Sequence, residues 1–416
     1  PRVAFNTWYG YGIRIDEATI LRQMELAASL GAERFVLDAG WAPGAGALGD
    51  LDFTAGLGRF TADQERFPSG LGALSARAHD LGLEFGLWVE PERVDLETVY
   101  YDETVDERWL ARRQGSLHPG ISDAESRAGQ LCLADPEARQ WVLDRLTALI
   151  EEAGIDYVKW DNNDWVNCDR PDHGHGSADG NFAHVAGLYE VLATLRERFP
   201  DLVIENCAGG ARRFDFGIMR YTDVAWMDDR TSPSALVRRN IARLGAIFPP
   251  PYLLSFVVEA EEEPLHEAAD LRLLLRSHMP GAMGLSVGET PPLDDWERAL
   301  IATEIGAHKS IADVQGRANM IALKVAGGWE VMEELSGDAA GAVLFAFQTD
   351  GEAGRTVLRP VGLRPDATYE VRSTDTGVLG TASGSDLMES GIEIEAWGQS
   401  AAHVLVLSLV EEGEET

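Results

Sequence analysis

The chain has 416 residues, which exceeds the usual length of one domain and favours a large domain with a smaller one beside it. Acidic residues outnumber basic ones by 69 to 35, so the net charge is −34. This charge argues against binding to nucleic acid or to an anionic membrane surface, because both require a cationic patch on the protein. An uncharged substrate is more consistent with this negative net charge.

The sequence contains no apolar run close to the roughly 20 residues that span a bilayer, and no charged segment followed by an apolar one opens it. The three cysteines are widely spaced and fit neither a disulfide framework nor a paired-cysteine zinc motif. We therefore expect a reducing, cytoplasmic location. Because the first residue is Pro1 rather than methionine, the sequence leaves open whether another segment precedes it. It also leaves open whether the chain forms a homo-oligomer.

Short β-branched or aromatic runs alternate with amphipathic helical stretches over the first three quarters of the chain, a pattern typical of parallel strands joined by crossover helices. Eight strands are predicted, at residues 3–8, 34–41, 84–91, 156–162, 202–207, 223–228, 252–258 and 282–287. Helical patterns cover residues 15–30, 136–153, 182–199, 234–248, 266–278 and 294–311. Eight repeats without a glycine-rich phosphate turn after the first strand predict a (β/α)8 TIM barrel.

The helical period ends near Gly327, and short alternating segments follow at residues 329–335, 342–348, 355–359, 368–373, 392–396 and 402–407. This pattern predicts a C-terminal antiparallel β-sandwich. The predicted domains are therefore a catalytic barrel at 1–316, a β-sandwich at 317–411 and an acidic tail at 412–416.

Barrel enzymes carry their chemistry at the carboxyl ends of the strands. The fourth predicted strand ends in Asp161 and the sixth leads to Asp228 and Asp229, so two acids lie on one rim. Retaining glycoside hydrolysis needs one ionised carboxylate as nucleophile and one protonated carboxyl as acid. Lys159 would help keep Asp161 ionised, and Asp228 would raise the pKa of Asp229. An isolated strand-terminal acid more often caps a helix or pairs with arginine.

Aromatic side chains recur at the same strand ends, where their faces suit the stacking of a pyranose ring, although each one alone is more often part of the core. They are Trp8, Trp41, Trp88, Trp160 and Trp226. The fifth strand leads into Cys207 and a run of small residues that includes Gly210, where the backbone can approach a ligand closely.

Taken in order, these strings resemble glycoside hydrolase family 36, the bacterial α-galactosidases. The segments that carry the resemblance are Asn6-Thr7-Trp8, residues 36–41, Phe67-Pro68-Ser69-Gly70-Leu71, residues 86–92 and Tyr157-Val158-Lys159-Trp160-Asp161-x-Asn163. The resemblance implies a retaining exo-glycosidase that needs no cofactor and acts on a terminal α-galactoside of an oligosaccharide or glycoside.

Matching residue by residue, the resemblance implies that Asp161 is the nucleophile and that Asp229 is the acid/base, with Asp228 as the alternative. It also implies sugar contacts from Asp38, Lys159, Asn163 and Cys207, and we place Trp8, Trp41, Trp88, Gly210, Trp226 and Asp228 with them in the binding site.

The sequence departs from the family where a second aspartate would contact the sugar hydroxyls, because Ala39 follows Asp38. The exact sugar therefore stays open among α-galactose, α-N-acetylgalactosamine and other α-glycosides. A galactosyl-transferring relative and a catalytically inactive sugar-binding protein are further alternatives. Family 36 proteins also have a β-sandwich before the barrel, which is absent from this sequence.

The segment at residues 167–175 holds Cys168, Asp169, Asp172, His173 and His175, all of which are types that bind metals. Their spacing matches no standard zinc pattern. We therefore expect no metal there and interpret the segment as a flexible loop at the rim of the substrate cleft.

Overall fold

The computed structural model describes residues 2–46, 52–100, 102, 104–117, 128–323, 327–349, 354–395 and 400–410. The predicted acidic tail at 412–416 lies outside these residues. The described residues form two compact units. One is Ala4–Asp229, and the other contains Arg2, Val3 and the chain from Arg230 onward.

Eight strands form a closed barrel in the order β1-β12-β11-β10-β9-β8-β3-β2. Their bounds are β1 Ala4–Asn6, β2 Arg34–Leu37, β3 Glu84–Val89, β8 Tyr157–Trp160, β9 Val203–Asn206, β10 Val224–Trp226, β11 Leu253–Val258 and β12 Ala282–Ser286. Each lies within one of the eight predicted strands, so the predicted barrel is confirmed. Several of the predicted strands extended too far at their carboxyl ends, because the chain leaves the sheet there to form the site.

The pairing register of the strands brings polar side chains to the same level of the barrel. Trp88 of β3 pairs with Lys159 of β8, and Lys159 pairs with Glu205 of β9. Nearly every residue of these strands is buried, as in parallel sheets that are covered on both faces. Charged residues at this level therefore need partners inside the barrel.

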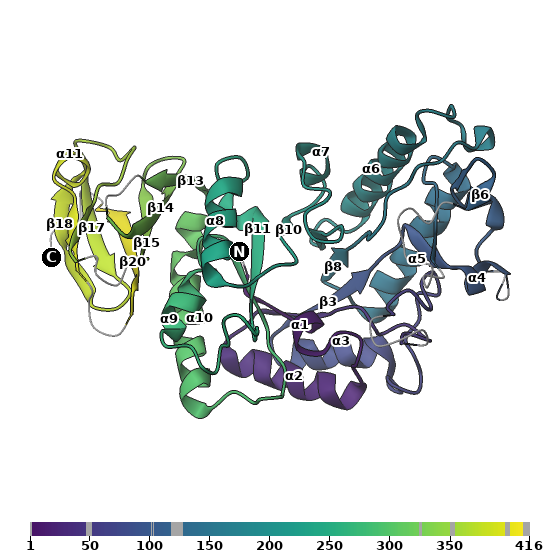
Figure 1. The fold of residues 1–416 in the computed structure, drawn as a ribbon, viewed down its shortest axis with the longest axis horizontal. Helices are drawn as coiled ribbons and strands as arrows, with labels where there is room; N and C mark the ends of the chain where they lie inside the picture. Colours follow the sequence, from purple (N-terminus) through teal and green to yellow (C-terminus); the bar gives the residue numbers. More distant parts are fainter. Residues whose placement is uncertain are drawn as a thin grey trace. The chain divides into compact units, whose positions relative to one another are not determined.

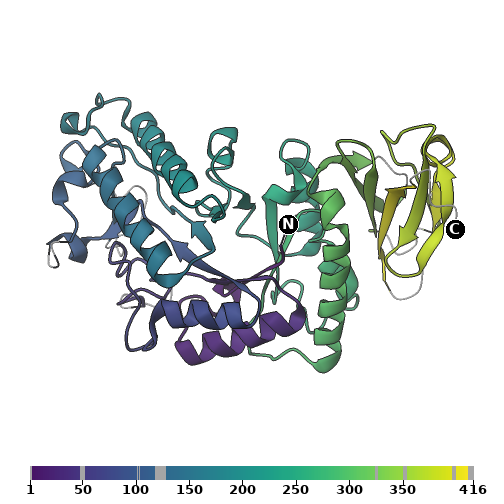
Figure 2. The same ribbon diagram turned by 180° about the vertical axis from the view of Figure 1, so that it is seen from behind.

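Helices follow most of the strands, and Figures 1 and 2 show α2 beside α3. Asp16 accepts a hydrogen bond from the Thr19 amide at the start of α2, and Asp135 caps α5 in the same way. Caps of this kind stabilise a helix by about 1 kcal/mol. The bounds are α1 Trp8–Tyr11, α2 Glu17–Leu30, α3 Gly70–Asp80, α4 Leu96–Tyr100, α5 Pro136–Ala153, α6 Gly180–Arg198, α7 Phe216–Met219, α8 Ser234–Leu244, α9 Leu271–Arg276 and α10 Asp295–Gln315.

Several helices differ from the sequence-based expectation: α8 ends at Leu244 and α10 at Gln315, where 248 and 311 were predicted, and α3 and α9 differ more. Helix α3 was not predicted, because its short apolar face rests on little more than Leu71, Leu74 and Ala78. Helix α9 begins at Leu271, five residues after the predicted start at His266, because Asp270 caps it through the Leu273 amide. The predicted helix at 136–153 matches α5 at both ends.

A long excursion between β3 and α5 contains four short strands. The antiparallel pair β4 (Arg93–Asp95) and β7 (Ala128–Gln130) brings the two ends of the excursion together, and β5 (Arg112–Arg113) pairs with β6 (Ser116–Leu117). The chain returns through Leu131, whose amide donates to the Glu92 carbonyl oxygen. The segment after β7 therefore lies next to the end of β3.

The C-terminal part forms a six-stranded antiparallel sheet in the order β13-β14-β15-β20-β17-β18 and a two-stranded sheet of β16 and β19. The bounds are β13 Ala318–Leu323, β14 Trp329–Ser336, β15 Gly341–Gln348, β16 Thr356–Leu358, β17 Thr368–Ser373, β18 Gly377–Ser383, α11 Gly384–Glu389, β19 Ile392–Ile394 and β20 Ala402–Leu409. Strands β13 and β18 were not predicted, because β18 is mostly exposed and β13 only half buried. The predicted boundary at residue 316 falls between α10 and β13.

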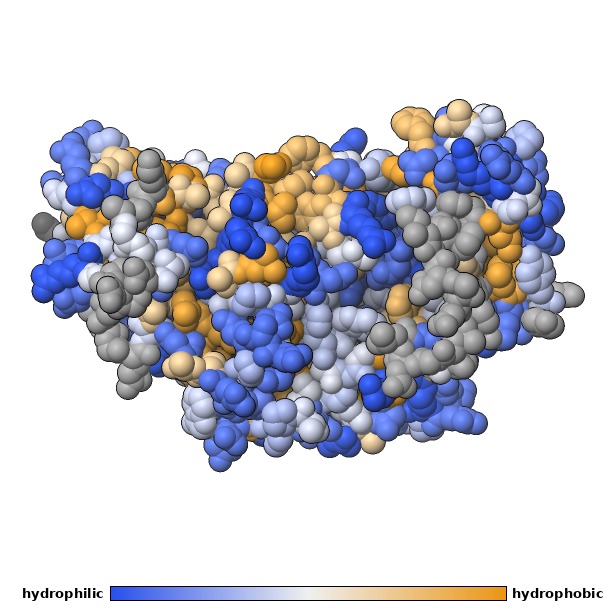
Figure 3. Space-filling model, viewed as in Figure 1, coloured by the Kyte–Doolittle hydropathy of each residue, from blue (hydrophilic) through white to orange (hydrophobic). Residues whose placement is uncertain are grey.

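Hydrophilic residues dominate the surface over α2 and α3 on the face seen in Figure 3, which agrees with the large net charge of the sequence. Among the described helices, none is both long and apolar enough to cross a bilayer.

Candidate active site

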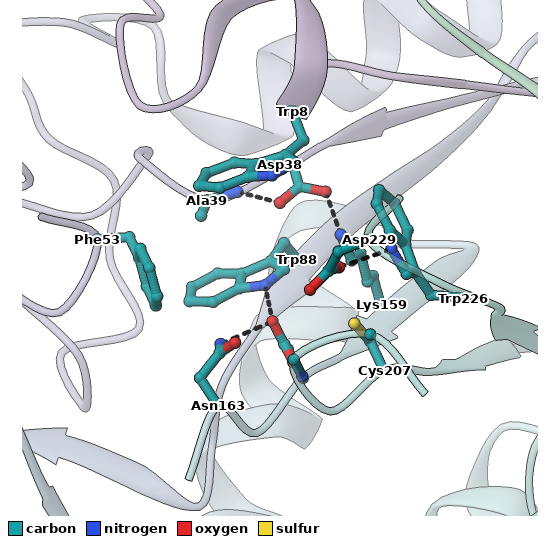
Figure 4. Close-up of a pocket in the computed structure, with 13 residues that line it drawn as sticks. Trp8, Asp38, Ala39, Phe53, Trp88, Lys159, Asn163, Cys207, Trp226 and Asp229 are labelled. Atoms are coloured by element: carbon teal, nitrogen blue, oxygen red, sulfur yellow. Dashed lines mark hydrogen bonds and ion pairs between the residues drawn. The ribbon is translucent and has the colours of Figure 1, made fainter. Parts of the chain in front are cut away.

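A pocket of about 400 Å³ opens at the carboxyl ends of strands β2, β3, β8, β9 and β10, within the unit Ala4–Asp229 (Figure 4). The lining residues are Trp8, Asp38, Ala39, Phe53, Trp88, Lys159, Asp161, Asn163, Cys207, Gly209, Gly210, Trp226 and Asp229.

Asp161 follows β8 directly and is 6% exposed. One carboxylate oxygen, Oδ2, accepts hydrogen bonds from Nδ2 of Asn163 at 2.8 Å and from Nε1 of Trp88 at 3.2 Å. The other, Oδ1, accepts from the Gly209 amide at 3.1 Å. Three N–H donors therefore hold the carboxylate in one orientation and complement its negative charge.

Asp229 lies three residues beyond the end of β10 and its side chain reaches solvent. Nε1 of Trp226 donates to its Oδ1 at 3.0 Å, and the Tyr9 hydroxyl donates to its backbone oxygen at 2.6 Å. Partial burial raises the pKa of Asp229 above its ordinary value, and the negative charge of Asp161 adds to the rise. Lys159 and the Trp226 hydrogen bond oppose it without reversing it.

Lys159 is 3% exposed and is held between an acid and an aromatic ring. Its Nζ lies 2.7 Å from Oδ2 of Asp38 and 3.5 Å from the centre of the Trp226 ring. Burial is the largest single influence and lowers the pKa of Lys159, but the negative charges around it, with that of Asp38 first, together outweigh burial, so the net shift is upward. Asn6 also donates to Oδ2 of Asp38, at 2.6 Å. The ammonium of Lys159 therefore keeps its charge inside the barrel at neutral pH.

One wall of the pocket is apolar. The Phe53 ring meets the rings of Trp8 and Trp88 edge-on, with centroids 6.0 and 5.9 Å apart, and Ala39 belongs to the same cluster (Figure 4). Ala39 stands where the family resemblance implies a second aspartate. At this position the wall offers a sugar apolar contact rather than a carboxylate.

The loop after β9 approaches both acids with its backbone. Gly209 donates to Asp161, and Gly210 has a φ of +79° and would place a Cβ atom 3.3 Å from the Asp229 carboxyl carbon. A larger residue at 210 would be strained and would press on that carboxyl. Cys207 is buried at the start of this loop, and burial raises the pKa of its thiol well above the usual value, so we expect it to be neutral.

A buried network lies behind β8. Glu92 is fully buried and accepts hydrogen bonds from Trp160, Asn162, Arg213 and His184 at 2.8, 3.1, 2.7 and 2.8 Å. Burial alone would raise the pKa of Glu92, but the Arg213 guanidinium and the donors hold it at about 2. Because Trp160 and Asn162 flank Asp161 in the chain, this network fixes the strand end that carries it.

The structure brings most of the predicted site residues together. The pocket is lined by Asp161, Asp229, Trp8, Asp38, Trp88, Lys159, Asn163, Cys207, Gly210 and Trp226. Trp41 is instead buried, and its Nε1 donates to the Trp88 carbonyl oxygen at 2.9 Å, so it supports the wall from behind. Asp228 precedes Asp229 without lining the pocket, and its charge contributes to the raised pKa of Asp229.

Phe53 and Gly209 also line the pocket, and neither was predicted from the sequence to do so. Phe53 lies in a loop far from any strand end, so the strand-end rule had no means of finding it. Gly209 was part of the small-residue run after β9, and the alternation of strands and loops gave no reason to prefer it over its neighbours.

Comparisons with known proteins identify the family of this chain. The melibiase family matches residues 1–316, and the glycosyl hydrolase family 36 C-terminal domain matches residues 329–407. A probable α-galactosidase C of Aspergillus flavus is 31% identical over 408 residues, which cover 93% of this chain and 50% of that protein. α-Galactosidase 2 of Hypocrea jecorina is 30% identical, with 97% and 53% covered. The chain thus spans about half the length of these curated relatives.

Among solved structures, the family 36 α-galactosidase AgaA of Geobacillus stearothermophilus superposes with a TM-score of 0.83 at 23% identity, covering 99% of this chain and 56% of that one. Variants of that protein have been solved in complex with raffinose and with stachyose. At this identity the likeness establishes the fold. The family match over residues 1–316, together with the barrel and its C-terminal β domain, shows that this chain belongs to the melibiase family of glycoside hydrolases.

Proposed function

We propose that this chain is a retaining α-galactosidase that removes terminal α-galactosyl groups from oligosaccharides such as raffinose and stachyose. The observation that carries the proposal is one pocket with two carboxyls in contrasting environments. Asp161 is surrounded by three N–H donors that suit an ionised nucleophile, whereas the pKa of Asp229 is raised, as an acid catalyst requires.

The reaction then proceeds in two displacements. In the first, a carboxylate oxygen of Asp161 attacks the anomeric carbon while the bond to the leaving oxygen breaks and Asp229 gives that oxygen its proton. A galactosyl ester of Asp161 results. In the second, Asp229 takes a proton from water, the water oxygen attacks the same carbon, and the ester bond breaks. The free sugar keeps its original anomeric configuration.

The remaining polar groups of the pocket suit the sugar hydroxyls. Asp38 accepts and Lys159 donates hydrogen bonds at one side, and the Asn163 amide lies beside Asp161. Trp8 and Trp88 supply ring faces and edges that exclude water. These groups converge on one pocket, which favours binding of a single terminal sugar and therefore action at chain ends.

The test is turnover of p-nitrophenyl α-galactoside and of raffinose by the purified chain, with Asp161→Asn, Asp229→Asn and the neighbouring Asp228→Asn as the matched control. We expect the first variant to lose roughly three to five orders of magnitude in kcat and the control to stay within about tenfold of wild type. If kcat falls more in Asp228→Asn than in Asp229→Asn, Asp228 rather than Asp229 is the acid.

Added azide separates the two roles. With a substrate whose leaving group needs no acid, Asp161→Ala should form β-galactosyl azide and Asp229→Ala should form α-galactosyl azide, because azide enters before or after the ester forms. Binding without turnover of any α-glycoside would identify a sugar-binding protein instead. Galactosyl transfer to an added acceptor in preference to water would identify a transferase.

A further inference from the structure

The loop that follows β8 gathers a second set of reactive side chains away from the pocket. Cys168, His173 and His175 lie in this loop, and Cys132 joins them from the segment after β7. One ligand atom from each of the four lies within 4.8 Å of the other three. Cys132, Cys168 and His173 are buried, and neither cysteine is in a disulfide.

The distances match the edges of a tetrahedral metal site. Sγ of Cys132 lies 3.5 Å from Nε2 of His175, and Sγ of Cys168 lies 3.5 Å from Nδ1 of His173. Zinc bonds of about 2.3 Å to sulfur and 2.0 Å to nitrogen place tetrahedral ligands about 3.3 to 3.8 Å apart. The two sulfur–nitrogen pairs therefore already have the spacing of ligands around one ion.

The backbone fixes which nitrogen of each imidazole is available. Nε2 of His173 lies 2.6 Å from the Arg108 carbonyl oxygen, and Nδ1 of His175 lies 2.8 Å from the Gly176 carbonyl oxygen. A carbonyl oxygen only accepts, so these nitrogens carry protons, and Nδ1 of His173 and Nε2 of His175 are the nitrogens that face the sulfurs. Protein-bound zinc commonly has histidine ligands oriented in this way.

The surrounding packing holds the four residues in place. The Cys132 amide donates to the Trp109 carbonyl oxygen, and both cysteines pack in one apolar cluster with Ala111 and Val166. Gly180, at the start of α6, leaves room for the loop, since a Cβ atom there would lie 2.0 Å from the Cys168 carbonyl oxygen. Apolar surroundings shield the thiolates from water and strengthen binding of a cation.

From this geometry we infer a structural zinc site formed by Cys132, Cys168, His173 and His175. Two sulfurs and two nitrogens in a closed tetrahedron select zinc among the common divalent ions. This departs from the expectation drawn from the sequence, which considered residues 167–175 alone and lacked Cys132.

The site ties the end of the β8 loop to the excursion after β3. The beginning of the same loop carries Asp161 and Asn163. On the other side, the Leu133 amide donates to Nδ1 of His184, whose Nε2 donates to Glu92. The ion thus anchors two segments that support the nucleophile strand without contacting the pocket.

The first measurement is the metal content of the full chain, produced with zinc in the medium and purified without chelators. We expect about one zinc ion per chain, and a large loss of zinc in Cys132→Ser and Cys168→Ser. His79→Ala is the matched control, because His79 pairs with Asp156 on the outside of the barrel and should leave the zinc content unchanged. Asp161→Asn should also retain zinc, so this result does not depend on the proposed hydrolase activity.

The absorption spectrum of bound Co²⁺ is a second test of the site. It uses the wild-type chain and therefore works even if the cysteine variants do not fold. After exchange into the site, Co²⁺ should show thiolate charge-transfer absorption and the intense d–d bands of tetrahedral coordination. The inference is overturned if the wild type binds neither ion, if Cys168→Ser and His79→Ala bind zinc equally, or if peptide mapping shows a Cys132–Cys168 disulfide.

Discussion

Nε1 of Trp226 donates a hydrogen bond of 3.0 Å to Oδ1 of Asp229, while the face of the same indole lies 3.5 Å from Nζ of Lys159. The last residue of β10 therefore contacts the candidate acid through its edge and the buried cation through its ring. Because the side chain of Asp229 itself reaches solvent, this bond and the Tyr9 contact to its backbone hold the carboxyl at the pocket.

Replacing this indole should move the pH profile. The Trp226 hydrogen bond favours the ionised carboxylate and lowers the pKa of Asp229, so Trp226→Phe should raise that pKa further. The acid is active while protonated, and the alkaline limb of the kcat/KM profile should shift to higher pH. We expect kcat itself to fall about tenfold, since the carboxyl is less well oriented. An unchanged or downward-shifted alkaline limb would contradict this role.

The Lys159 and Asp38 pair predicts a non-additive effect on stability. Both side chains are buried, so Lys159→Met leaves the Asp38 carboxylate without its cation. We expect a loss of about 3 to 5 kcal/mol in the free energy of unfolding. Adding Asp38→Asn to Lys159→Met should recover part of this loss, because no unpaired charge then remains. Denaturant unfolding of the single and double variants measures the coupling, and additive losses would argue against a direct pair.

The alanine at position 39 should affect how strongly the protein prefers an α-galactoside over its 6-deoxy analogue. The resemblance to family 36 implies a pair of aspartates here that contacts the galactose 4- and 6-hydroxyls. In this chain Asp38 is present, the second aspartate is replaced by Ala39, and the wall at Ala39 is apolar. We expect the wild type to cleave α-galactoside and its 6-deoxy analogue with similar kcat/KM. Ala39→Asp should raise the preference for galactoside about tenfold.

Ala39→Asn is the matched control, since it adds an amide without adding a charge next to Asp38. If the wild type already has a kcat/KM several orders of magnitude higher for the α-galactoside than for its 6-deoxy analogue, another group must bind the 6-hydroxyl.

Glu334 of β14 predicts a pH dependence of stability outside the pocket. It is fully buried, Oε1 accepts from Gln315 at 3.3 Å, and burial raises its pKa from 4.5 to about 8. In the unfolded chain the Glu334 carboxyl ionises near pH 4.5, whereas in the folded chain it keeps its proton up to about pH 8. Glu334 therefore contributes stability that is full below pH 4.5 and is lost as the pH rises toward 8.

We expect Glu334→Gln to be more stable than wild type at pH 8 and closer to it at pH 5, measured by chemical unfolding at both values. Glu393→Gln serves as the control, because Glu393 is exposed in a surface ion pair with Arg355 and should change stability by less than about 1 kcal/mol. Equal effects of the two substitutions at both pH values would contradict the raised pKa of Glu334.

The strand-end chemistry could be predicted from the sequence because it is local. Each strand is a short buried run, its last residues point to one rim, and the order Lys159-Trp160-Asp161 already places a cation and an acid there. Closure of eight parallel strands then brings Asp38, Cys207 and Asp229 to the same pocket without further information. For the same reason β11 was predicted to within one residue and α5 was predicted correctly at both ends.

Other features depended on contacts between segments that are distant in the sequence. Phe53 enters the wall through a loop, Trp41 turns inward to bond Trp88, and Cys132 meets Cys168 across 36 positions of chain. Loop paths follow from packing and from backbone hydrogen bonds to partners elsewhere, and residue periodicity does not encode either one. The sequence alone therefore determined the barrel and its rim acids, and the tertiary structure decided the shape of the apolar wall and the clustering of the second site.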